Sequence, residues 1–189
     1  MTLAVTSLIL IMMLVTAVGT LSYFQTQYKA TLTAHQIGMV ELLAGSIDAA
    51  IKSAQSALSS NAKIFPAEAA DDPKKIQQWL ESRTGLKTQF FTNHLMMFNQ
   101  NGSVVALTPL SHDISHAEQH IQKVVGQTFA SGTPQISAPI PCCNNPKELQ
   151  MIFTAPVMVN GVQKLVLAGS FNMNRPNFLS HFLHVKIGH

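Results

Sequence analysis

The sequence predicts an α+β fold, in which a transmembrane helix and a long stalk helix precede an antiparallel five-stranded sheet with helices. Three observations support this prediction. A charge-free apolar run occupies the N-terminus, a proline-free segment with helical periodicity follows it, and an alternation with a period of two appears after residue 88. The expected divisions are a transmembrane anchor over 1–24, a stalk helix over 25–64, a sheet module over 65–175 and the start of a linker over 176–189.

The composition limits the classes of function. The 189 residues are 47% hydrophobic and 11% charged, which excludes a disordered protein. The lysines and arginines are scattered, and no basic stripe is present that could neutralise a row of phosphates, so nucleic acid is not an expected partner. The sequence has no nucleophile elbow, HExxH motif, P-loop or dinucleotide fingerprint. We therefore expect neither an enzymatic activity nor a cofactor.

The run from Leu3 to Phe24 carries no charged residue. About 22 residues at a rise of about 1.5 Å span roughly 33 Å, which is enough to cross a hydrocarbon core of about 30 Å. A cleaved signal peptide is the alternative, because Ala17-Val18-Gly19 offers small residues near a plausible cleavage point. No basic region precedes the run, however, and the run is longer than the apolar part of a usual signal peptide. We expect residues 3–24 to form an uncleaved membrane anchor.

Apolar residues recur in the predicted stalk helix at alternating steps of three and four. This heptad pattern is typical of a seam that packs against a partner helix or against a sheet. Homodimerisation through residues 37–58 and packing against the chain's own sheet both fit, and the sequence leaves the two open. The seam residues are Ile37, Val40, Ala44, Ile47, Ile51, Ala54 and Leu58.

Two shorter helices are expected after the stalk, which Pro66 should end. Asp71-Asp72-Pro73 predicts the start of a helix that continues through Arg83, with acidic residues near the N-cap and proline in the first turn. A further helix is expected over 115–129, with Gly132 beyond its end.

Five strands are expected, and Asn-Gly pairs mark two of the connections between them. Asn101-Gly102 and Asn160-Gly161 both favour tight hairpin turns. The order of long helix, two strands, helix and three strands predicts an antiparallel sheet with helices on one face. The expected strands are 88–98, 104–107, 135–140, 149–157 and 162–173.

Four segments resemble the Cache family of bacterial extracellular sensors, and specifically the membrane-distal half of a double Cache (dCache) domain. The resemblance implies a PAS-like module in the periplasm or outside the cell, held in the inner membrane by one span. It also implies a small-molecule ligand and an output of the histidine kinase, diguanylate cyclase or chemoreceptor type. We expect the chain to be a fragment that lacks this output, and the alternative is a stand-alone protein that acts through another chain. The segments are MMFNQNGSVVAL, FASGTPQISAPI, MIFTAPVMVNGVQKLVLAGSFNM and NFLSHFLHVKIGH.

Strand parity locates a candidate ligand site. Three of the expected strands have one apolar face and one face that mixes small, polar and apolar residues. The resemblance implies that this mixed face, together with the 115–129 helix, encloses the ligand, although the mixed face could instead simply meet solvent. The candidate ligand-binding residues are His116, Gln119, His120, Ser137, Thr154, Ser170 and Asn172.

The chemistry of this region favours some ligands over others. The stretch HDISHAEQHIQ contains no arginine and no aromatic residue, which argues against tight binding of a carboxylate and favours neutral or weakly polar ligands. His112, His116 and His120 are spaced by four, but three histidines stacked on one helix cannot easily surround one ion, so no metal site is expected. Adjacent Cys142 and Cys143 are interpreted as part of a structural turn.

A second class of function also fits the sequence. The chain could be a membrane-anchored structural or adaptor protein whose heptad helix binds a partner and whose module takes no small ligand. A sheet face filled by bulky side chains would favour this alternative.

Overall fold

The computed structural model describes residues 12–14, 16, 19–20, 40–109, 118–142, 145–174 and 179. The chain divides into two compact units, Met1–Ser46 and Ile47–His189. In the first unit, all the residues that the structure describes are helical. Within the described residues, no helix combines the length and the apolar character that a membrane span needs. Most of the predicted anchor, Leu3–Phe24, lies outside them.

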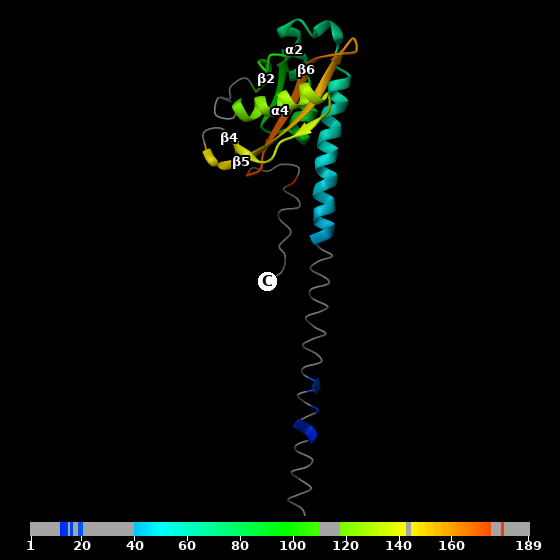
Figure 1. Ribbon diagram of the computed structural model, residues 1–189, viewed down its shortest axis with the longest axis vertical. Helices are drawn as coiled ribbons and strands as arrows, with labels where there is room; N and C mark the ends of the chain where they lie inside the picture. The colour runs from blue at the N-terminus through cyan, green and yellow to red at the C-terminus, as the bar shows by residue number, and fades with distance from the viewer. Residues whose placement is uncertain are drawn as a thin grey trace, which may run out of the picture. The chain divides into compact units, whose positions relative to one another are not determined.

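The larger unit begins inside a helical run that covers residues 40–63. Its part of this run, residues 47–63, is called the supporting helix below. A short 3-10 helix, three α-helices and six strands follow it (Figure 1). They are η1 (Ala67–Ala69), α2 (Pro73–Glu81), α3 (Thr84–Gln89), β1 (His94–Asn99), β2 (Val104–Thr108), α4 (Glu118–Ser131), β3 (Gln135–Ile136), β4 (Ile140–Cys142), β5 (Asn145–Val159) and β6 (Val162–Asn172).

The six strands form one sheet with the order β2-β1-β6-β5-β3, and β4 also pairs with β5. All pairs are antiparallel, so the predicted fold class of an antiparallel sheet with helices is confirmed. The sheet has six strands instead of five, because the expected strand 135–140 divides into β3 and β4. At the division, Ser137 Oγ accepts a hydrogen bond from the Ile152 backbone N–H at 3.0 Å.

The expected strand 88–98 is wrong in its first half. Thr84–Gln89 forms α3, which buries Leu86 in the core, and β1 begins only at His94. Gly85 therefore lies inside a helix, just beyond Arg83, through which the preceding helix was expected to continue. The β-prone residues between α3 and β1 do not form a strand. Phe91, one of them, packs its ring against Gly169 of the sheet.

The predicted start of α2 and the predicted turn between β5 and β6 are confirmed, whereas the expected start of the 115–129 helix lies outside the described residues. Asp72 caps α2 by accepting a hydrogen bond from the Lys74 backbone N–H at 3.0 Å, and Pro73 is the first helical residue. Asn160 and Gly161 join β5 to β6 with positive φ angles of 52° and 80°, the conformation that asparagine and glycine adopt most readily. Gly132, with φ of 65°, follows the end of α4.

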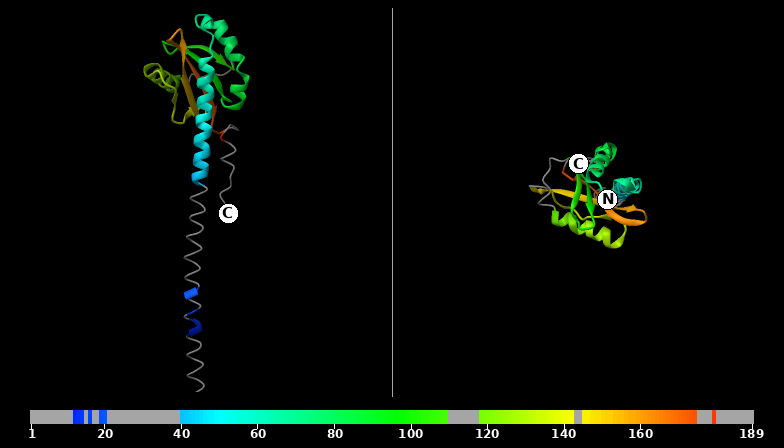
Figure 2. Two further views of the ribbon diagram at one scale, coloured as in Figure 1. Left: turned by 90° about the vertical axis from the view of Figure 1, so that its right-hand side faces the viewer. Right: turned by 90° about the horizontal axis from the view of Figure 1, so that it is seen from above.

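The sheet lies between helices on both faces, not on one face as expected (Figure 2, right). The supporting helix and α2 cover one face, where Ala54, Leu58 and Ala62 pack in a continuous apolar core with Phe153 and Leu167. We call this the supporting-helix face. Helix α4 covers the opposite face, the α4 face, and packs there in a second and smaller apolar cluster.

The heptad seam therefore has two parts. From Ile47 onward its residues pack against the chain's own sheet, with Ala54 and Leu58 fully buried. In the smaller unit, Val40 is 54% exposed and the neighbouring Leu42 is 74% exposed. Ile37 lies outside the described residues. Core packing thus accounts for the second part of the pattern but not for the first.

Candidate functional site

Apolar side chains fill the middle of the α4 face. Ile121 and Val125 of α4 are buried against residues of β1, β5 and β6. The buried strand residues in this cluster are Met96, Phe98, Ile140, Ile152, Val166 and Ala168. The predicted mixed face thus lies under a helix, as expected, but its centre is a packed core.

Towards one end of the sheet, the same face becomes polar. Residues His94, Gln150, Ser170 and Asn172 belong to the α4 face by strand parity, and we call them the polar cluster. The pairing of β1 with β6 sets His94 opposite Ser170, and the pairing of β5 with β6 sets Gln150 opposite Asn172. Each of the four is at most 2% exposed. Four polar side chains are thus held together at the start of β1 and the end of β6.

Hydrogen bonds fix the orientation of these side chains. The Ser170 hydroxyl lies 3.4 Å from His94 Nδ1. Gln150 Oε1 accepts from Asn93 Nδ2 at 3.1 Å, while Gln150 Nε2 donates to the carbonyl of Pro141 at 3.5 Å. Each lost hydrogen bond would leave a desolvated polar group in the sheet, so these contacts hold the side chains in place.

Asn172 connects the polar cluster to a carboxylate. Its Nδ2 donates to Glu148 Oε2, and its Oδ1 accepts from the Asn174 backbone N–H at 2.8 Å. Glu148 is only partly buried, so its carboxylate lies between the cluster and the surface. The arrangement offers an imidazole, a hydroxyl, two amides and a negative charge within a small region.

The structure separates the predicted site residues into three groups. Ser170 and Asn172 belong to the polar cluster. Thr154 contacts Thr128 of α4 instead, and Ser137 bonds to the backbone of Ile152. Gln119 and His120 are exposed in the first turn of α4, and His116 lies outside the described residues.

Sequence reasoning missed His94 and Gln150. Gln150 stood on the mixed face by parity, and His94 alternates with Met96 and Phe98 along the same strand, so the signal for both was present. The register between the strands could not be predicted from the sequence. Only the pairing of His94 with Ser170 and of Gln150 with Asn172 distinguishes these residues from other polar residues on mixed faces.

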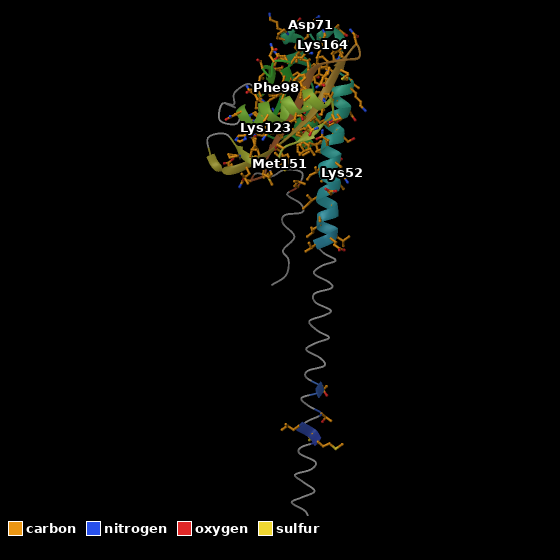
Figure 3. The ribbon with its side chains drawn as sticks, viewed as in Figure 1. Lys52, Asp71, Phe98, Lys123, Met151 and Lys164 are labelled. Atoms are coloured by element: carbon orange, nitrogen blue, oxygen red, sulfur yellow. The ribbon has the colours of Figure 1, made fainter. Side chains whose placement is uncertain are left out.

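Surface hollows lie at the opposite end of β1. One, of about 390 Å³, is lined in part by Asn99, Asn101 and the ion pair between Lys164 and Asp71, whose Nζ and Oδ1 are 3.1 Å apart (Figure 3). The other, of about 510 Å³, lies between the β1–β2 turn and α4. Neither hollow includes a predicted site residue. In the described part of the chain, no group of three or more histidine, cysteine, aspartate or glutamate side chains is placed to hold a metal ion.

Comparison with known proteins finds the fold but no close relative. No protein-family model matches the chain, and no curated protein matches it. Among solved structures, the ligand-binding domain of the Pseudomonas aeruginosa amino acid chemoreceptor PctB in complex with L-Arg has a TM-score of 0.60 at 14% identity. The match covers 79% of this chain and 56% of that one.

Two further chemoreceptor domains match similarly. The ligand-binding domain of P. aeruginosa PctC in complex with GABA has a TM-score of 0.58 at 15% identity, covering 77% of this chain and 61% of that one. The ligand-binding domain of P. fluorescens CtaA in complex with L-leucine has a TM-score of 0.58 at 13% identity, and the match covers 77% of this chain and 59% of that one. The chain shares its fold with these ligand-binding domains. It spans about three fifths of the length of these domains, and the resemblance expected from the sequence is confirmed for the fold.

Proposed function

We propose that the chain is the ligand-binding input domain of a bacterial transmembrane signalling protein, and that the polar cluster forms part of its ligand site. The observation that carries this proposal is the burial of His94, Gln150, Ser170 and Asn172 on the α4 face of a Cache-type fold. Burying polar side chains in a sheet is costly compared with burying apolar ones of similar size. The supporting-helix face, by contrast, is packed mainly with apolar side chains.

The chemistry of the cluster supports a small polar ligand without net negative charge. The hydroxyl, the imidazole and the amides can exchange their present hydrogen bonds for bonds to a ligand, and Glu148 would repel an anion and attract a cation. This agrees with the lack of arginine in the HDISHAEQHIQ stretch. The similar domains were solved with L-Arg, GABA and L-leucine, so amines and amides are the first compounds to screen.

We also propose that residues 3–24 anchor the chain in the inner membrane with the module outside the cytoplasm, and that the exposed first part of the seam contributes to a homodimer. The charge-free run and the exposed seam residues Val40 and Ala44 support these assignments. A reporter fused near residue 60 that is active only in the cytoplasm would exclude this topology.

One observation favours the adaptor alternative. Bulky side chains fill the middle of the α4 face, which is the feature expected of a module without a ligand. The two functions differ at the polar cluster, since only the sensor requires a ligand to bind there.

Thermal unfolding of the purified full chain with neutral and cationic small molecules tests the proposal. A ligand at about a hundred times its dissociation constant should add about 2.7 kcal/mol to the free energy of unfolding. Asn172→Leu should remove most of this response because it removes the amide that faces Glu148. Ser137→Ala is the control, because Ser137 lies between β3 and β4 and outside the cluster, and this variant should retain the response. A screen without any stabilising compound, or a response that survives Asn172→Leu, would favour the adaptor.

A further inference from the structure

A hydrogen bond joins the supporting helix to the sheet at one point. Gln55 Nε2 donates to the backbone carbonyl of Thr154 in β5 at 2.8 Å. Gln55 Oε1 is also buried, and within the described residues no hydrogen-bond partner faces it. The other contacts between this helix and the sheet are apolar. The amide of Gln55 is therefore only half satisfied, and the contact is less firmly held than a fully paired one would be.

The side chain of the same Thr154 points to the other face of the sheet. Its Oγ1 lies 2.6 Å from Oγ1 of Thr128 in α4, and 3.2 Å from the carbonyl of Gln135 in β3. Thr128 and Thr154 are both fully buried. Thr154 thus touches the supporting helix through its backbone and α4 through its side chain.

The two hydroxyls have fewer protons than contacts. Thr128 Oγ1 is placed to donate to the Val124 carbonyl at 3.0 Å, and Thr154 Oγ1 to the Gln135 carbonyl at 3.2 Å. Each hydroxyl has one proton, so only two of the three hydrogen bonds can exist together. Because the two hydroxyl oxygens are only 2.6 Å apart, a proton must lie between them. Either Thr154 donates to Gln135 and accepts from Thr128, or Thr154 donates to Thr128, which then donates to Val124. The pair therefore has two arrangements of similar geometry that bind α4 differently.

We propose that Thr154 couples α4 to the supporting helix, so that the hydrogen-bond arrangement of α4 biases how firmly Gln55 holds the sheet. Two sites are energetically coupled when both contact an element that has two states. The coupling is a property of the folded chain itself. Its use in signalling rests on the proposed function, in which a ligand beside α4 shifts the arrangement.

A double-mutant cycle on the full chain tests the coupling without any ligand. Gln55→Leu removes the amide, and Thr128→Val removes the hydroxyl while keeping the shape. Trp79, the single tryptophan of the sequence, is 8% exposed and packs edge to face on Phe65 at 5.0 Å. Its fluorescence therefore reports urea unfolding. Independent sites change the unfolding constant by factors that multiply to within about twofold.

The expected result is a departure from that product by about fivefold or more. It should disappear when Thr128→Ser, which retains the hydroxyl, replaces Thr128→Val in the cycle, and it should also disappear in a Thr154→Val background. Gln77 is the matched control, because its amide also joins a helix to a strand, with Oε1 accepting from the Leu107 N–H at 3.1 Å and Nε2 donating to the Leu107 carbonyl at 3.0 Å.

Gln77→Leu combined with Thr128→Val should be multiplicative to within about twofold. Multiplicative behaviour of Gln55→Leu with Thr128→Val, or an equal departure in the Gln77 control, would overturn the proposal. Because no ligand is used, failure of this cycle is distinct from failure of the proposed function, which shows in the compound screen.

Discussion

The two faces of the sheet bury different kinds of side chain. On the supporting-helix face, the rings of Phe91, Phe153 and Phe171 pack in sequence, with centroids 5.6 and 5.9 Å apart. On the α4 face, an apolar middle is followed by the polar cluster at one end. Aromatic packing contributes stability without polar groups to satisfy. We infer that the supporting-helix face contributes most of the stability. The α4 face contains buried polar side chains that stability alone does not explain.

We expect the largest change in stability from a substitution at the contact between Gly169 and Phe91 on the supporting-helix face. A Cβ at Gly169 would lie 2.5 Å from Cγ of the fully buried Phe91. Gly169→Ala must displace this ring and should lower the free energy of unfolding by about 1–3 kcal/mol. Gly126→Ala in α4 is the control, because nothing lies within 4 Å of its Cβ position. It should raise stability by up to about 1 kcal/mol. Changes of the same sign in urea unfolding would contradict this account of the two faces.

Within the α4 face, we expect the smallest effect for a substitution in the polar cluster. Ser170 contacts His94 at a long 3.4 Å, so Ser170→Ala should cost less than about 1 kcal/mol. Thr154→Val removes a fully buried hydroxyl with contacts of 2.6 and 3.2 Å and should cost about 1–3 kcal/mol. Urea unfolding of both variants gives the comparison. A larger cost for Ser170→Ala would mean that the polar cluster serves the stability of the fold.

Local signals in the sequence predicted most of the larger unit. Asn101-Gly102 and Asn160-Gly161 have the backbone conformations that their residue types favour, and Asp72 with Pro73 starts α2 as expected. The exception was the segment before His94. Its residues are β-prone, yet its first part forms α3 and the ring of Phe91 packs in the core. The tertiary contacts that Leu86 and Phe91 make there outweigh the local preference for a strand.

The candidate site was only half predictable. Alternation along single strands identified Ser170 and Asn172 as members of the mixed face. It could not show that Thr154 lies beside Thr128, or that His94 lies beside Ser170, since both depend on contacts between distant segments. The faces of the strands were readable from the sequence, but the groups that meet on those faces were not.

The most direct test of the central claim is the response of His94 to a ligand. Nuclear magnetic resonance of the full chain labelled at histidine, with His94 assigned through His94→Gln, follows its imidazole during titration with the compound that stabilises the chain. The account predicts that the His94 signals shift with the same dissociation constant as the stabilisation. Exposed His120 in the first turn of α4 should change less. Saturation of the stabilising effect without any change at His94 would contradict a ligand site at the polar cluster.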